Sequence, residues 1–128
     1  MDFPNYAAAF HQHHFVDFPH VRPPFGWEAF VEWHEQRGKA RATTQKHLSH
    51  VRRLLGALGE PNIYLMENLG FYLTQFEVVR AAVLALRPRL SPSTIRSYAM
   101  SVSLAATWPM LQLPEALIEQ YREFWLSL

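Results

Sequence analysis

The chain has 128 residues, of which 49% are hydrophobic, with 12 Lys and Arg, 11 Asp and Glu, a formal net charge of +1 and no cysteine. This length predicts one domain with its own core, and the lack of cysteine excludes a disulfide scaffold, a thiolate metal site and a thiol nucleophile. No apolar run approaches the ~20 residues that cross a bilayer, and the N-terminus lacks the pattern of a signal peptide, so we expect an intracellular protein with no membrane partner.

The first 24 residues differ in composition from the rest. They hold four of the nine prolines and four of the seven histidines. We predict that residues 1–24 form a flexible N-terminal arm and that residues 25–128 form a helical domain. The histidines of the arm are His11, His13, His14 and His20. Imidazoles can bind zinc, copper or nickel, but proline-rich flanks do not fix a geometry, so we predict neither a metal site nor a cofactor.

Apolar residues at helical spacing predict two helices between residues 27 and 58. Gly38 is expected to end the first, and Gly59 the second, which begins near Thr43 or Thr44. The residues expected on their buried sides are Trp27, Phe30, Val31, His34, Leu48, Val51, Leu55 and Leu58.

The second half of the chain has the same helical character. The segment from Pro61 to Tyr72 is ambiguous, but the spacing of Thr74 and Glu77 is typical of a capping box and predicts a helix that ends before Pro88. A further helix is expected from Pro92 to Trp108, with Ser91 as its cap, and a last one from Pro114. No stretch alternates as a strand, so the predicted fold class is all-α, a bundle of five or six helices.

The charges are segregated along the chain. No acidic residue lies between Glu35 and Glu60, or between Glu77 and Glu115. The basic residues in these two intervals are Arg37, Lys39, Arg41, Lys46, Arg52, Arg53, Arg80, Arg87, Arg89 and Arg96. Such segregation indicates a surface that faces a polyanion. The alternative is that the basic side chains are only solvated and scatter in three dimensions.

Two predicted helices share one plan: "RATTQKHLSHVRRLLGALG" and "SPSTIRSYAMSVSLAATW" both open with hydroxyl residues and place a base early. On the first, Lys46, His50 and Arg53 form a ridge opposite the leucines. On the second, the side away from the apolar stripe carries Ser93, Thr94, Ser97 and Ser101, with Arg96 beside them. Helix N-termini and small hydroxyls suit phosphates, and Arg or Lys can reach base edges. The alternative is two ordinary capped surface helices.

The order of these elements resembles the N-terminal core-binding domain of the tyrosine recombinase (phage integrase) family, nearest to its Cre-like branch. An aromatic-rich helix ("FGWEAFVEWHEQRG") precedes a Thr-led helix ("ATTQKHLSHVRRLLGAL"), followed by "LTQFEVVRAAVLALRPR", "LSPSTIRSYAMSVSLAATWPML" and the closing "LPEALIEQYREFW". The resemblance covers roughly residues 25–126. The segment "EPNIYLMENLGFYL" is longer than the usual connection in that family.

The resemblance implies a SAM-like bundle with near-orthogonal helical hairpins that grips duplex DNA and helps protomers assemble on a recombination site. It implies no small-molecule substrate. The DNA-facing residues that it implies are Arg41, Thr44, Lys46, His50, Arg53, Arg87, Arg89, Ser93, Thr94, Arg96 and Ser97. The candidate contacts with neighbouring protomers are the aromatic residues of the first and last helices, Trp27, Trp33, Phe124 and Trp125.

Catalysis by this chain is not expected. His50 and Arg53 match the His-x-x-Arg pair with which tyrosine recombinases bind the scissile phosphate, but the remaining catalytic residues belong to a separate domain that this sequence lacks. We therefore predict a non-catalytic DNA-binding domain. The alternative function is a helical protein–protein interaction module without a nucleic-acid role.

Overall fold

The computed structural model describes residues 27–61 and 69–128; the predicted arm and its four histidines lie outside them. In this part of the chain there are six α-helices, one 3-10 helix and no strand, which confirms the all-α prediction. The elements are α2 (Trp27–Glu35), α3 (Arg41–Ala57), α4 (Leu69–Leu73), α5 (Phe76–Leu84), α6 (Pro92–Ala106), η2 (Pro109–Leu111) and α7 (Glu115–Leu126). None of these helices has both the length and the apolar character needed to cross a membrane.

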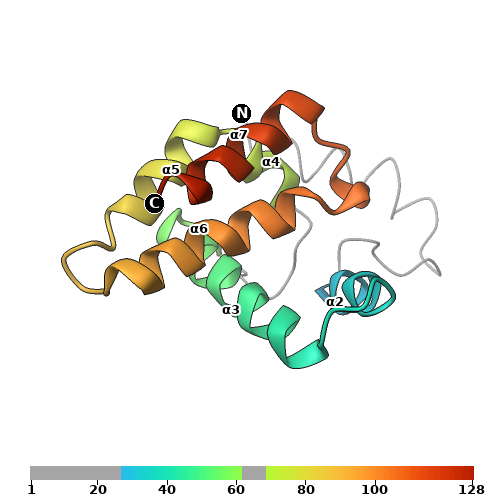
Figure 1. The fold of residues 1–128 in the computed structure, drawn as a ribbon. Coiled ribbons are helices and arrows are strands. Elements are labelled where there is room, and N and C mark those ends of the chain that lie inside the picture. Colours follow the sequence, from blue (N-terminus) through green and yellow to red (C-terminus); the bar gives the residue numbers. More distant parts are fainter. Residues whose placement is uncertain (1–26, 62–68) are drawn as a thin grey trace.

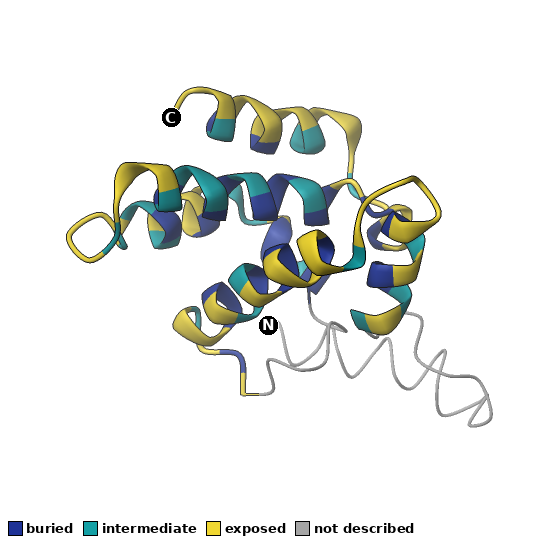
Figure 2. Cartoon of the chain, turned by 60° about the horizontal axis from the view of Figure 1, so that its bottom comes forward, coloured by how far each residue is buried: buried dark blue, intermediate teal, exposed yellow. Residues whose placement is uncertain are grey.

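Helix α6 is the centre of the fold. It packs against α3 on one side and against α7 on the other, and α5 also contacts it (Figure 1). Small buried side chains on α6, among them Ala99, Ala105 and Ala106, let the neighbouring helices come close. Figure 2 shows the result: buried residues follow the inner side of each helix, and exposed residues follow the outer side.

Large aromatic residues join the outer helices to this centre. Phe30 of α2 meets Trp108, just after α6, edge to face, with ring centroids 5.4 Å apart. The Tyr121 hydroxyl of α7 donates a hydrogen bond of 2.6 Å to the carbonyl of Leu73, the last residue of α4. Burial raises the pKa of this phenol far above its usual value, so it remains a donor at physiological pH.

Phe124 belongs to the core and not to a surface that contacts another protomer. It is buried, and its ring lies 6.1 Å from that of Phe76 on α5. Its position on α7 is one helical turn from Tyr121, so both side chains face inward. The prediction that Phe124 is a protein contact is therefore wrong.

The helix ends follow the predictions in part. Gly38 and Gly59 have φ of 89° and 98°, the left-handed conformation that ends a helix, as expected. The predicted capping box is wrong, because α5 begins after Gln75 without a side-chain cap. The Thr74 hydroxyl donates instead to the Phe71 carbonyl at 2.6 Å and so closes α4. Helix α5 ends at Leu84, before Pro88 as predicted, and a turn leads to Pro88.

The Ser91 cap is present, because its hydroxyl oxygen accepts the backbone N–H of Thr94 at 3.3 Å. Replacing Ser91 by Ala should lower the free energy of unfolding by about 1 kcal/mol, measured by urea denaturation. Ser93→Ala is the matched control, since the Ser93 hydroxyl contacts only the Ser91 hydroxyl, at 3.2 Å. Equal stability of the two variants would show that the cap does not contribute.

Candidate nucleic-acid interface

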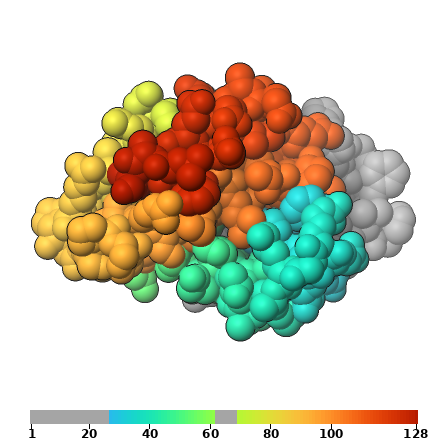
Figure 3. Space-filling model, viewed as in Figure 1, coloured from blue at the N-terminus to red at the C-terminus, as the bar shows by residue number. Residues whose placement is uncertain are grey.

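One face of the molecule is built by α3, α6 and α7, with α6 between the other two. Figure 3 shows the atoms of α6, in orange, exposed between α7, in red, and α2 and α3, in blue to green. Four of the residues of α6 that remain at least partly exposed recur every three or four positions and so follow one line along it. They are Ser93, Ser97, Met100 and Leu104, and Thr107 continues the line beyond the helix.

The packing of α3 on α6 joins the two acid-free stretches of the sequence into one surface. Neither helix contains an acidic residue, and the two are among the most extensively packed pairs in the fold. On α3, the edge that adjoins α6 carries the exposed Lys46, the half-buried His50 and the exposed Arg53. We call the surface formed by Lys46, His50, Arg53, Ser93, Thr94 and Ser97 the α3–α6 face.

A buried serine connects the two helices. Ser101 of α6 is fully buried; its hydroxyl lies 2.6 Å from Nδ1 of His47 and 2.9 Å from Nδ1 of His50, both on α3. The same hydroxyl donates a hydrogen bond of 2.8 Å to the carbonyl of Ser97. A hydroxyl has one proton to give, so both imidazoles must donate their Nδ1–H to it. The prediction that Ser101 lines the exposed side of α6 is therefore wrong.

This arrangement excludes Ser101 as a nucleophile. A general base must offer a lone pair to the serine hydroxyl, whereas His47 and His50 both offer a proton. Ser101 is also closed off from solvent, so no substrate can reach it. The Ser–His contact is a structural link between α3 and α6. It was not found from the sequence because the partners lie about fifty residues apart.

Arg53 and His50 hold Tyr98 between them. The His50 and Tyr98 rings stack with centroids 4.1 Å apart, and Nη1 of Arg53 donates to the Tyr98 hydroxyl at 2.7 Å. Arg53 therefore serves the contact between the helices while the side chain as a whole stays exposed. Burial and the charge of Lys46 lower the pKa of His50, so this imidazole is neutral at pH 7.

Of the two predicted DNA contacts at the start of α3, that of Thr44 is wrong, whereas that of Arg41 stays a prediction for a side chain already paired with two glutamates. Thr44 is fully buried, and its hydroxyl lies 3.3 Å from the carbonyl of Ala40, to which it donates. Arg41 forms ion pairs with Glu28 at 2.6 Å and with Glu35 at 3.1 Å. These contacts fix α2 against α3. We had expected Thr44 on the polar side of α3 because the helix was predicted to begin there, whereas it begins at Arg41.

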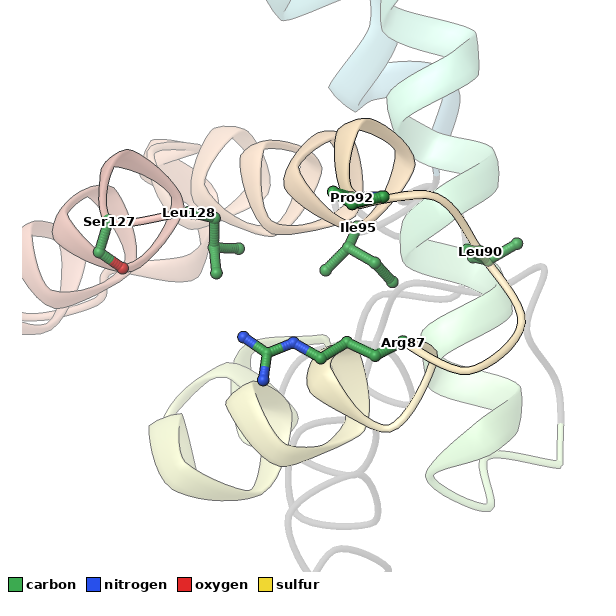
Figure 4. Close-up of a pocket in the computed structure, with 6 residues that line it drawn as sticks. All are labelled: Arg87, Leu90, Pro92, Ile95, Ser127 and Leu128. Carbon is green, nitrogen blue, oxygen red and sulfur yellow. The ribbon is translucent and has the colours of Figure 1, made fainter.

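The arginines around α6 point in different directions. Arg96 lies over the half-buried ring of Trp125 on α7, 4.8 Å from its centroid. Figure 4 shows the Arg87 side chain extending away from α3, toward Ser127 and Leu128, in a cavity of about 420 Å³. Arg87 is therefore not placed on the α3–α6 face. Arg89 is exposed, and no partner is recorded for it within residues 27–61 and 69–128.

Arginine side chains also lie over the two tryptophan rings of α2. Arg37 lies over the Trp33 ring at 3.9 Å and donates to the Trp33 carbonyl, and Arg52 lies over Trp27 at 5.3 Å. Both rings are half-buried. Trp27, Trp33 and Trp125 thus stay partly accessible, each beside a cation, and none of them is a bare apolar contact surface.

His34 is buried on α2 between the rings of Phe30 and Trp33. Burial, with the charges of Lys39 and Arg37, lowers its pKa to about 4. Where the structure describes the chain, no group of three or more His, Cys, Asp or Glu side chains is arranged to hold a metal ion.

No protein-family model, curated protein or solved structure has significant similarity to this chain. A functional proposal therefore depends on the residues of the site.

The Ser101 link predicts a specific loss of stability. Ser101→Ala leaves the Nδ1–H groups of His47 and His50 without their acceptor, which should lower the free energy of unfolding by about 1–3 kcal/mol. Ser103→Ala is the control, because Ser103 is a nearly buried serine of the same helix with no hydrogen bond recorded for its hydroxyl among the described residues. Thermal or urea unfolding measures both, and equal losses would contradict the link.

The buried histidines predict acid sensitivity. Burial, with the charges of Lys46, His50 and Lys39, lowers the pKa of His47 from 6.5 to about 4. Because the unfolded chain then binds this proton more readily, the stability that His47 contributes is present above pH 6.5 and is lost as the pH falls toward 4, by up to about 3 kcal/mol.

The comparison of parent and His47→Gln isolates this contribution. Urea denaturation at pH 7 and pH 4.5 should show a smaller loss of stability in the variant than in the parent. The same loss of stability in both proteins would contradict the lowered pKa of His47 in the folded chain.

Proposed function

We propose that this chain is a non-catalytic domain that binds duplex DNA, comparable to the core-binding domain of tyrosine recombinases. The observation that carries the proposal is the packing of α3 on α6, two helices without acidic residues, into a continuous surface. A surface that lacks carboxylates and carries cations and hydroxyls attracts the phosphates of a duplex.

The groups available for phosphate are fewer than the sequence suggested. Lys46 and Arg89 are exposed, with no ion pair recorded for them in the described part of the chain. Ser93, Thr94 and Ser97 place small hydroxyls on the first turns of α6, where backbone N–H groups and the helix dipole favour an anion. Lys46 and the three hydroxyls belong to α3 and α6, which the contacts of Ser101 with His47 and His50 hold together, so the duplex would meet a rigid surface. Arg89 lies in the turn between α5 and α6.

Assembly of protomers on a recombination site is the wider role that the resemblance suggests. With Phe124 in the core, Trp125 is the aromatic residue of α7 that stays partly exposed. A protomer contact at α7 would therefore involve Trp125 and the exposed Leu126.

The alternative function, a protein-interaction module without a nucleic-acid role, has weaker support. The large hydrophobic residues that are exposed, Val78, Met110, Leu126 and Leu128, come from α5, η2, and α7 and the residues after it. Each half-buried tryptophan on the terminal helices is covered in part by an arginine. Neither observation favours an apolar interface.

The test is the salt dependence of duplex binding. Affinity for a random-sequence duplex should fall log-linearly with salt, because each phosphate contact releases counterions. Replacing Lys46 and Arg89 together by Gln should lower the slope by about 2. Both are exposed, so the fold should be unaffected.

Arg80→Gln serves as the control, since Arg80 is an exposed arginine of α5 beside Glu77, at 3.8 Å. It should leave the slope unchanged. Duplex binding that does not respond to salt, or an unchanged slope in the double variant, would contradict the proposal.

A further inference from the structure

A pocket of about 260 Å³ opens where α3, α6 and α7 meet. Its lining residues come from four parts of the chain: the turn before α3, α3 itself, α6 with the residue after it, and α7. They include Lys39, His47, Met100, Leu104, Arg122 and Trp125. The pocket contains two cations and no acid, although Glu119 pairs with Arg122 from outside it at 2.8 Å.

The polar groups of the pocket are suited to an anion that also carries hydrogen-bond donors. Lys39, in the turn before α3, and Arg122, on α7, are both exposed and bring two positive charges to the lining. The Arg122–Glu119 pair is a surface ion pair, worth about 0–1 kcal/mol, so it yields readily to a phosphate. Because Nδ1–H of His47 is given to Ser101, the remaining ring nitrogen, Nε2, carries a lone pair and accepts a hydrogen bond.

The apolar part of the lining is suited to a flat ring. Trp125, Met100 and Leu104 supply it, and Arg96, 4.8 Å from the ring centroid, holds the Trp125 indole in place. Aromatic side chains stack on bases of any sequence. The volume lies just below the roughly 300–1,000 Å³ of usual ligand sites, which limits an occupant to a single small unit.

We propose that this pocket binds one nucleotide unit, with the phosphate at Lys39 and Arg122 and the base beside Trp125. An inorganic phosphate would leave the apolar lining unused, and a nucleoside would leave both cations unused. The inference is independent of duplex binding, since it involves different side chains from Lys46 and Arg89. Two ligands offer this same phosphate and base: a free mononucleotide, or an unpaired residue of a DNA strand.

Calorimetric titration of the whole chain with deoxyadenosine monophosphate tests the proposal. The nucleotide should bind more tightly than either inorganic phosphate or deoxyadenosine. Arg122→Gln and Lys39→Gln should each weaken it by about tenfold, the effect of losing one hydrogen bond to a charged group. Both residues are exposed, so circular dichroism should report unchanged folding.

Arg80→Gln is the matched control, because Arg80 and Arg122 are both exposed helical arginines paired with a glutamate three residues earlier. It should leave nucleotide affinity unchanged. Deoxyadenosine monophosphate that binds no tighter than inorganic phosphate, or an equal loss in Arg80→Gln, would overturn the proposal. A protein that binds the nucleotide and no duplex would contradict the proposed function alone.

A second titration identifies the source. A duplex with one unpaired adenosine is compared with the fully paired duplex, in the parent and in Arg122→Gln. A preference for the unpaired residue that Arg122→Gln removes assigns the pocket to a strand of DNA. Equal affinity for the two duplexes, with tight binding of the free nucleotide, assigns it to a mononucleotide.

Discussion

A single buried hydroxyl joins α3 to α6: Ser101 accepts from His47 and His50 and donates to the Ser97 carbonyl. At this seam, the Ser101 hydroxyl, the Ser97 carbonyl and Nδ1 of both imidazoles each have a partner, and buried polar groups that are paired in this way favour one arrangement of the two helices. Its hydrogen bonds fix both imidazoles as Nδ1–H tautomers. Burial and the charge of Lys46 lower the pKa of both rings, so they add no further charge between the two helices. Through this seam, two acid-free stretches of the chain become one surface, and α6 is held where α7 can cover its other side.

Several arginines of this domain form contacts that stabilise its fold, and these contacts determine which cations remain available to bind phosphate. Arg41 is engaged by two glutamates, Arg53 by Tyr98 and Arg96 by Trp125. A planar guanidinium stacks on aromatic rings and forms fixed hydrogen bonds, which a lysine ammonium does less well. A count of basic residues along the sequence therefore overestimates the number of cations that can meet a phosphate backbone. Lys46 and Arg89 are exposed, with no ion pair in the described part of the chain.

The fold class and most helix ends were predictable from the sequence because they depend on local rules. Helical spacing located α3 and α6, and Gly38, Gly59 and Ser91 ended or began helices as expected. The site was predictable only in part. Thr44 and Ser101 look like surface hydroxyls in sequence, and a shift of two or three residues in where α3 begins, or a partner fifty residues away, places them in the interior. Phe124 near the end of the chain looked exposed, but Phe76 across the bundle covers it. Such outcomes depend on tertiary contacts, which no local pattern encodes.

In the proposed function, α3 and α6 together present one surface to DNA. The most direct test is a ¹⁵N–¹H NMR spectrum of the chain with and without a random-sequence duplex, read residue by residue. We expect the amide shifts to change at residues 46–53 of α3 and at residues 93–97 of α6 in the same titration, with those of α5 unaffected. Changes on only one of the two helices, or changes centred on α5, would contradict it.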